Sequence, residues 1–386
     1  MCIRDRNDGG GLLFRGFPEA RNEPVNVVVH ISYPELSITG YSCGDLFFQP
    51  RLRQAALEGL RRFTEATEKS GTVAIVGLPF LYGDALYNTA AVVQAGRVLA
   101  LVPKTMLPNY REFYEKRQFT SARALGTGTR EITVNGAQVP FGTDIVFHDT
   151  SSPFSFGVEI CEDLWSVIPP SSTLALHGAR AILNPSAGTE LTGKAAYRRE
   201  LVKQQSGRCL CAYALSSAGV HESTTDVVFG GHCLIADNGR LAAESARFLR
   251  ENSLILADVD FERLAAGRLS ESSFNDNKPL PYTGKMLHVT LETDVPASPG
   301  LEYAFNPPRP FLPVPEHRDE RCEEIISIQT AGIAKRMEHA RVQRLVIGIS
   351  GGLDSTLALL ICARACRLLG RPASDILAVT MPGFGT

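Results

Sequence analysis

Short apolar runs bounded by turn residues recur along the chain and predict β-strands. Two hairpins stand out, because turn residues separate paired runs at Gln94-Ala95-Gly96 and at Asp237-Asn238-Gly239. The predicted strands are residues 25–31, 72–80, both arms of 87–103, strands within 132–148, 155–160, the A-R-A-I-L run before Asn184, 209–216, and runs starting at Ser253 and Leu287.

Helical periodicity separates several of these runs. Residues 51–70 place Leu52, Ala56, Leu60 and Phe63 at steps of three to four, which predicts an amphipathic helix. Further helices are predicted at residues 171–178 and 194–208. Alternating strands and helices over about 260 residues predict an α/β fold in which helices cover sheets in layers.

Residues 295–318 contain seven prolines and predict a linker. Beyond it the pattern predicts a helix at 321–340, a strand at 344–349, a helix at 355–369 and a strand at 376–380. This βαβ start lasts about 60 residues, fewer than a doubly wound domain needs, so we expect a truncated domain and a fragment. The expected regions are a poorly patterned N-terminus (1–24), a first domain (25–294), the linker and a second domain (319–386).

The composition is that of a globular protein that buries a large core. Of the 386 residues, 44% are hydrophobic and 21% charged, and the formal net charge is −2. This charge gives no support to a nucleic-acid or anionic-membrane partner. The sequence lacks an apolar run of about 18 residues and a signal-like N-terminus. Nine scattered cysteines predict reduced thiols in the cytoplasm, without zinc-site spacing; Cys362 and Cys366 are predicted to pack in a core.

Three polar residues each follow a predicted strand: Glu35, Lys104 and Cys161, the last within F-G-V-E-I-C-E-D-L-W. Layered α/β folds gather functional groups at strand ends. Glu35 is placed to take the thiol proton, Lys104 to hold the oxygen of a tetrahedral intermediate, and Cys161 to attack an amide or nitrile carbon. The alternatives are a buried cysteine acting as a small apolar residue and two solvated surface charges.

A second motif, L-V-I-G-I-S-G-G-L-D-S-T, covers residues 345–356. An apolar strand leads through a glycine-rich loop into a helix, so its backbone N–H groups are placed to cradle an anion. It lacks the lysine of a Walker A loop. The alternative is an ordinary tight turn between strand and helix.

P-E-L-S-I-T-G-Y, V-P-K-T-M-L-P-N-Y-R-E-F-Y-E and E-I-C-E-D-L-W resemble the signature blocks of the nitrilase (carbon–nitrogen hydrolase) superfamily, and in detail those of the glutaminase domain of bacterial glutamine-dependent NAD synthetases. The resemblance implies a four-layer α-β-β-α sandwich, with Glu35 as general base, Lys104 as oxyanion stabiliser and Cys161 as nucleophile. It adds Glu112 as a supporting carboxylate. It places glutamine binding at Tyr110, Phe113, Glu115, Gly188 and Lys194, although the family usually has serine at the position of Gly188.

The glycine-rich loop resembles the pyrophosphate-binding loop of N-type ATP pyrophosphatases, the synthetase half of the same family. The resemblance implies ATP binding with Mg²⁺, without a dedicated protein metal site, at Gly348, Ile349, Ser350, Gly351, Gly352, Leu353, Asp354 and Ser355. It further implies a homo-oligomer that hydrolyses glutamine and uses the ammonia, with ATP, to amidate deamido-NAD to NAD.

Two rival functions remain at this stage. A stand-alone amidase or nitrilase would have no use for ATP, so the loop after the linker counts against it. A non-catalytic nucleotide-binding or interaction module would leave Cys161 merely buried. Rapid, selective alkylation of Cys161 at neutral pH would distinguish this module from an enzyme.

Overall fold

The computed structural model describes residues 30–150, 152–222, 227–277, 285–292, 311–313 and 315–381. The chain divides into two compact units, Met1–Ala304 and Phe305–Thr386. The predictions for residues 1–24, for most of the linker at 295–318 and for the start of the strand at 25–31 lie outside the described residues.

The first unit contains two mixed sheets. One has six strands, in the spatial order β1 (His30–Ser32), β2 (Val73–Tyr82), β3 (Ala85–Gln94), β4 (Arg97–Pro103), β6 (Ala137–Phe141) and β5 (Arg130–Val134). The β1–β2 and β4–β6 pairs are parallel and the others antiparallel. The predicted hairpin is confirmed as β3 and β4, and its turn residues Ala95 and Gly96 both have positive φ.

The second sheet has seven strands. Their spatial order is β12 (Arg240–Glu244), β11 (Leu234–Asp237), β10 (Ala212–Ser217), β9 (Ala181–Ser186), β8 (Ser155–Val158), β7 (Ile145–Asp149) and β13 (Leu287–Leu291). The predicted turn at Asp237-Asn238-Gly239 joins β11 to β12, which pair antiparallel. The parallel strands β8, β9 and β10 lie at the centre, where both sheet faces are covered.

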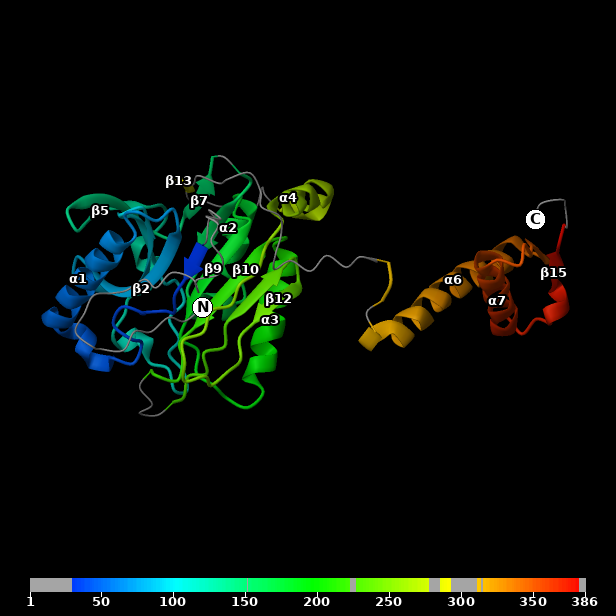
Figure 1. The fold of residues 1–386 in the computed structure, drawn as a ribbon, viewed down its shortest axis with the longest axis horizontal. Helices are drawn as coiled ribbons and strands as arrows, with labels where there is room; N and C mark the ends of the chain where they lie inside the picture. Colours follow the sequence, from blue (N-terminus) through cyan, green and yellow to red (C-terminus); the bar gives the residue numbers. More distant parts are fainter. Residues whose placement is uncertain are drawn as a thin grey trace, which may run out of the picture. The chain divides into compact units, whose positions relative to one another are not determined.

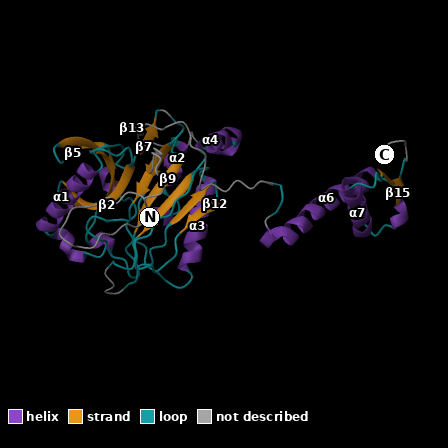
Figure 2. Ribbon diagram, viewed as in Figure 1, coloured by secondary structure: helices purple, strands orange, loops and turns teal. Residues whose placement is uncertain are grey.

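The sheets pack face to face, and helices cover their outer faces (Figures 1 and 2). Along β2, Val73 and Ile75 belong to the core between the sheets, whereas Ala74 and Val76 pack with α1 (Pro50–Ala66). This alternation follows from the two-residue period of a strand. On the other sheet, α2 (Pro170–Leu176) and α3 (Lys194–Arg208) supply the outer layer. The predicted four-layer α-β-β-α arrangement is confirmed.

One predicted strand is wrong. The run from Ser253 contains a single bridging residue and otherwise no regular structure up to Asp260. It is followed by two helices that the pattern did not predict, α4 (Phe261–Ser270) and α5 (Ser272–Asp276). Val259 and Phe261 pack against the core between the sheets, so the apolar character of this segment reflects packing of an irregular stretch.

Short 3₁₀ helices occur in the loops of the first unit. They are η1 (Gly44–Phe48), η2 (Glu115–Arg117), η3 (Ala122–Leu125) and η4 (Cys161–Trp165). The last of these begins at the predicted nucleophile.

The second unit follows the predicted order of elements. It comprises η5 (Pro315–His317), α6 (Arg318–Ala340), β14 (Leu345–Gly348), α7 (Leu353–Leu368), η6 (Ala373–Asp375) and β15 (Ile376–Val379). β14 and β15 pair in parallel. Cys362 and Cys366 are buried on α7, and Cys366 packs against Ala334 and Met337 of α6, as predicted. None of the helices in the described part of the chain combines the length and the apolar character that a membrane span requires.

Candidate active site

Glu35 and Lys104, which lie far apart in the sequence, meet in the interior of the first unit. Each follows a strand, β1 or β4, that ends at the same side of the six-stranded sheet. Lys104 Nζ lies 2.5 Å from Glu35 Oε1 and 2.7 Å from Glu115 Oε1. The side chains of Lys104 and Glu35 are fully buried. A buried cation is tolerated only when it is paired, and here two carboxylates share it.

Glu35 is held through one of its two oxygens. Asn88 Nδ2, from β3, donates to Glu35 Oε1 at 2.6 Å, the same oxygen that receives Lys104. Glu35 Oε2 is buried and has no hydrogen-bond partner among the described residues. That oxygen therefore retains its capacity to accept a proton.

The structure places Glu115, and not Glu112, against Lys104. Glu115 is buried and also accepts a hydrogen bond from Tyr41 Oη at 2.7 Å. Glu112, expected to be the supporting carboxylate, instead accepts from Thr189 Oγ1 at 2.8 Å. The loop between β4 and η2 turns back at Arg111, which has positive φ, and Glu115 N donates to Pro108 O. This turn directs Glu115 inward to Lys104, while Glu112 lies beside the Thr189 hydroxyl.

Cys161 occupies a strained turn where β8 leads into η4. Its φ is +46°, a left-handed conformation that costs energy for a residue with a side chain. Its backbone N–H donates to Asn184 Oδ1 at 2.9 Å, and Ser186 Oγ donates to its sulfur at 3.3 Å. The carboxylate of Asp163 accepts from the backbone N–H groups of Ile160, Thr105 and Met106, which fixes the turn to the segment after Lys104.

Burial, more than the neighbouring charges, keeps the thiol of Cys161 protonated. Burial raises the pKa of Cys161 to about 12; the charge of Glu35 adds to this rise, while Lys104 opposes it. Burial alone would lower the pKa of Lys104, but the carboxylates of Glu115 and Glu35 raise it well above its ordinary value. Lys104 is therefore a cation. Since a thiolate is the reactive form, the thiol proton has to leave during the attack, which requires an adjacent base.

The expected glutamine-binding residues Tyr110, Phe113 and Lys194 lie near one another. Tyr110 Oη donates to Glu162 at 2.8 Å, and the rings of Tyr110 and Phe113 meet edge to face. Lys194 Nζ lies 5.4 Å from the Phe113 ring centre and 5.6 Å from that of Trp165.

The loop after β9 connects this group to Gly188. Lys194 Nζ donates to Thr189 Oγ1 at 3.2 Å, and the Thr189 hydroxyl in turn contacts Glu112. A Cβ added at Gly188 would make ordinary contacts at 3.6 Å or more, so the backbone there does not require glycine. The adjacent Thr189 lines a hollow of the site.

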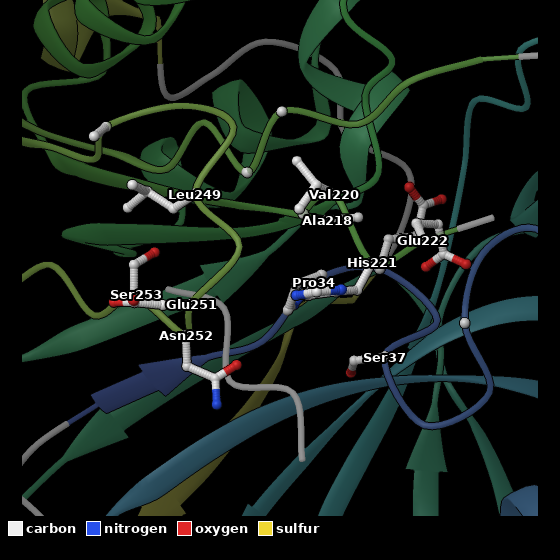
Figure 3. Close-up of a pocket in the computed structure, with 16 residues that line it drawn as sticks. Pro34, Ser37, Ala218, Val220, His221, Glu222, Leu249, Glu251, Asn252 and Ser253 are labelled. Atoms are coloured by element: carbon white, nitrogen blue, oxygen red, sulfur yellow. The ribbon is translucent and has the colours of Figure 1, made fainter. Parts of the chain in front are cut away.

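Two hollows border the buried cluster. One is lined by Glu115 together with Glu112, Phe113, Thr189 and Tyr41, among other residues. The other lies beside Glu35. Figure 3 shows its walls: Pro34 and Ser37 follow β1, Ala218 to Glu222 follow β10, and Leu249 and Glu251 to Ser253 form the opposite side. Glu35 and Glu115, which share Lys104, are thus lining residues of different hollows.

Several residues of the site were missed in the sequence. They share one feature, a polar side chain within or beside an apolar strand: Asn88 in β3, Asn184 and Ser186 in β9, and Thr189 just after β9. The asparagine that begins N-T-A-A-V-V was a usable signal, since a buried polar group needs a partner. Trp165, the one tryptophan in the chain, lies on η4 and stacks on Tyr197 of α3.

In the second unit, the expected nucleotide loop joins β14 to α7. Gly351 has a φ of +85°, Gly352 N donates to Ser350 Oγ at 3.3 Å, and the hydroxyls of Ser350 and Ser355 are 3.3 Å apart. The loop residues 350–354 are exposed. Asp354 lies in the first turn of α7 and provides a carboxylate of the kind Mg²⁺ prefers.

Comparisons with known proteins match both units. The carbon-nitrogen hydrolase family model matches residues 19–269, and the NAD synthase family model matches residues 325–386. The glutamine-dependent NAD(+) synthetase of Mycobacterium bovis is 41% identical over 360 residues, which cover 92% of this chain and 52% of that protein. The enzyme of the same name from Mycobacterium leprae is 38% identical, covering 100% of this chain and 56% of its own length. The chain thus spans about half the length of the curated relatives it matches.

A solved structure agrees with these matches. The crystal structure of a glutamine-dependent NAD(+) synthetase from Cytophaga hutchinsonii aligns with a TM-score of 0.54 and 25% identity, covering 89% of this chain and 46% of that one. The four-layer fold and a family match across most of the first unit therefore agree, and the chain belongs to the carbon-nitrogen hydrolase family.

Proposed function

We propose that the first unit hydrolyses glutamine to glutamate and ammonia, with Cys161 as the nucleophile. The main support for this proposal is the buried ion pair of Lys104 and Glu35. Both charges act on the thiol of Cys161, which is protonated. Identity of 38–41% to proteins called glutamine-dependent NAD(+) synthetases supports glutamine as the substrate.

In the first half of the reaction, Glu35 Oε2 takes the thiol proton as the sulfur attacks the side-chain carbonyl carbon. The resulting tetrahedral oxyanion is stabilised by the ammonium of Lys104. When the C–N bond breaks, the protonated Glu35 returns the proton to the leaving nitrogen, and ammonia departs. A glutamyl thioester on Cys161 remains.

Hydrolysis of the thioester repeats these steps with water. Glu35 takes a proton from the water, the oxygen attacks the thioester carbon, and Lys104 again holds the oxyanion. The C–S bond then breaks, the sulfur regains the proton, and glutamate leaves. Glu115 keeps Lys104 charged and in place throughout, because its carboxylate bonds the same ammonium.

The charged side chains around Thr189 suit a zwitterionic amino acid as the substrate. Lys194 and Glu112, bridged by the Thr189 hydroxyl, offer opposite charges for the carboxylate and ammonium of the substrate. Tyr110 and Phe113 supply aromatic surface beside them.

We further propose that the second unit contributes the loop that binds the phosphates of ATP in a longer synthetase. There the ammonia would amidate deamido-NAD to NAD, with release of AMP and pyrophosphate. The exposed hydroxyls and N–H groups of residues 350–355 support phosphate binding, and Asp354 would supply an oxygen ligand to Mg²⁺. The match of residues 325–386 to NAD synthases supports this assignment.

Measuring glutamate release by this chain and by Cys161→Ala tests the first proposal. We expect the substitution to abolish turnover and to leave the fold intact, because the thiol accepts only the hydrogen bond from Ser186 that is described above. Cys322→Ala, at an exposed cysteine of α6, serves as the matched control with full activity. Equal glutamate release by Cys161→Ala and the control would refute the proposal.

A further inference from the structure

Arg198 is a buried cation that the proposed chemistry does not use. It lies on α3, one turn after Lys194, and only 1% of its surface is exposed. A buried guanidinium needs partners for its donors, and these partners show which part of the molecule it supports.

Its guanidinium joins three groups. Nη1 donates to Glu190 Oε1 at 2.8 Å and lies 2.9 Å from His232 Nδ1, while Nη2 donates to the backbone oxygen of Thr189 at 3.4 Å. Because arginine has donors only, His232 Nδ1 is the acceptor. His232 Nε2–H then donates to Glu244 Oε1 at 2.7 Å.

These partners tie α3 to the loop after β9. Glu190 pairs with Arg198, and its backbone N–H also donates to Val228 O at 2.8 Å. Gly230 is in close contact with the Glu190 side chain; a Cβ there would come within 2.6 Å of it. The loop is thus held from two sides. Arg198 provides the buried charged support, and the exposed Arg247 also pairs with Glu190, at 3.2 Å.

The same loop carries Thr189 into the hollow that borders Glu115. The Thr189 backbone oxygen accepts from Arg198, while its hydroxyl contacts Glu112 and Lys194. A shift of the loop would therefore move the hydroxyl that bridges Glu112 and Lys194. Neither Cys161, Glu35 nor Lys104 hydrogen-bonds to Arg198 in the described part of the chain.

We propose that Arg198, held by Glu190 and His232, is a positioning residue that fixes Thr189 and thereby sets the affinity of the site for glutamine. The inference rests on the proposed glutaminase function. It assigns Arg198 an effect on substrate binding and little effect on the chemical steps.

Steady-state glutamine hydrolysis by Arg198→Met separates these two effects. We expect KM for glutamine to rise about tenfold or more, since one charge-assisted hydrogen bond contributes about that factor. We expect kcat to fall by less than about threefold. The rate at which iodoacetamide alkylates Cys161 should stay at the wild-type value, because this small reagent reacts without binding to Thr189.

Two further variants complete the test. Lys203→Met removes a partly exposed cation from the same helix and should leave KM unchanged. Arg198→Lys keeps the buried charge but cannot reach all three partners, so its KM should lie between the wild-type and Arg198→Met values. Trp165 fluorescence shows whether Arg198→Met folds. If it does not fold, the KM of Arg198→Lys is compared with the wild-type value instead.

An unchanged KM in a folded Arg198 variant, or a fall in kcat as large as the rise in KM, would overturn the inference alone. The absence of glutamate release from the wild-type chain would instead overturn the proposed function, and this inference with it. The wild-type measurement, made first, distinguishes the two failures.

Discussion

The two units build their candidate sites in opposite ways. In the first, groups that are distant along the chain meet in the interior; Glu35 and Lys104 are 69 positions apart and both fully buried. In the second, residues 350–355 follow one another in a single loop whose polar groups are largely exposed. The first site therefore depends on the folding of a whole layered domain, whereas the second depends on a local backbone turn. Removing the shared cation should therefore lower the stability of the first unit, whereas substitutions in the exposed loop should have only local effects.

Lys104→Met should produce the largest effect. It removes the shared cation and leaves two buried carboxylates facing each other, which should lower the free energy of unfolding by about 3–5 kcal/mol. Glutamate release should fall below detection, since the oxyanion loses its stabiliser. Urea denaturation followed by Trp165 fluorescence measures the first effect, because Trp165 lies in the first unit.

The control is Lys203→Met, which removes a partly exposed lysine that is paired with Glu200. It should change the free energy of unfolding by less than about 0.5 kcal/mol. Comparable denaturation midpoints for Lys104→Met and the control would show that the buried cluster is not a structural unit.

Glu35→Gln should abolish most activity and spare the fold. The amide oxygen can still accept from Asn88, and Lys104 keeps Glu115 as its counter-ion. Removing a general base typically costs about 10²–10⁴-fold in rate. Glutamate release should fall within that range while the Trp165 denaturation midpoint stays close to the wild-type value. Activity within a factor of two of wild type, about 0.4 kcal/mol, would exclude Glu35 as the base.

Glu115→Gln should change how stability depends on pH. Burial raises the pKa of Glu115 to about 7, and Lys104 opposes the rise. The folded state therefore keeps a proton that the unfolded chain releases near its ordinary pKa of 4.5, so stability falls as pH rises from about 4.5 to 7. The variant should show a shallower decline across this window in urea midpoints. Glu131→Gln, at an exposed position, should retain the wild-type slope, and an equal slope in Glu115→Gln would contradict the account.

Asp354→Asn should have the smallest effect on the first unit. It changes one exposed carboxylate of the second unit, so glutamate release and the Trp165 denaturation midpoint should both match wild type. Pyrophosphate binding in the presence of Mg²⁺, measured by calorimetry, should weaken. A marked loss of glutamine hydrolysis would show that the two sites are not separate.

The sequence predicts well those features that are local. The strand ends carrying Glu35, Lys104 and Cys161, and the loop after β14, follow from runs of apolar residues that stop at a polar group. The layers follow from the strand period of two residues and the helix period of about 3.6 residues. β2 is apolar on both faces and is therefore covered on both sides, whereas α1 is apolar on one face only. These features need no knowledge of distant contacts.

The choice between Glu112 and Glu115 could not be made in this way. Both lie in a loop without a regular period, and the inward direction of Glu115 depends on the turn at Arg111 and on Tyr41, 74 positions away. The strand predicted from Ser253 was wrong for a related reason. Its apolar residues pack on a core formed elsewhere in the chain, so their pattern does not reveal whether they pair in a sheet.

The central claim is that Cys161, beside Glu35 and Lys104, attacks glutamine and becomes acylated. Acid quenching of the chain during turnover, followed by peptide mass mapping, tests it most directly. The account predicts a glutamyl adduct on the peptide that contains Cys161, and none on that peptide in Glu35→Gln quenched at the same early time. Glutamate release with no adduct at Cys161, or with the adduct at another cysteine, would contradict it.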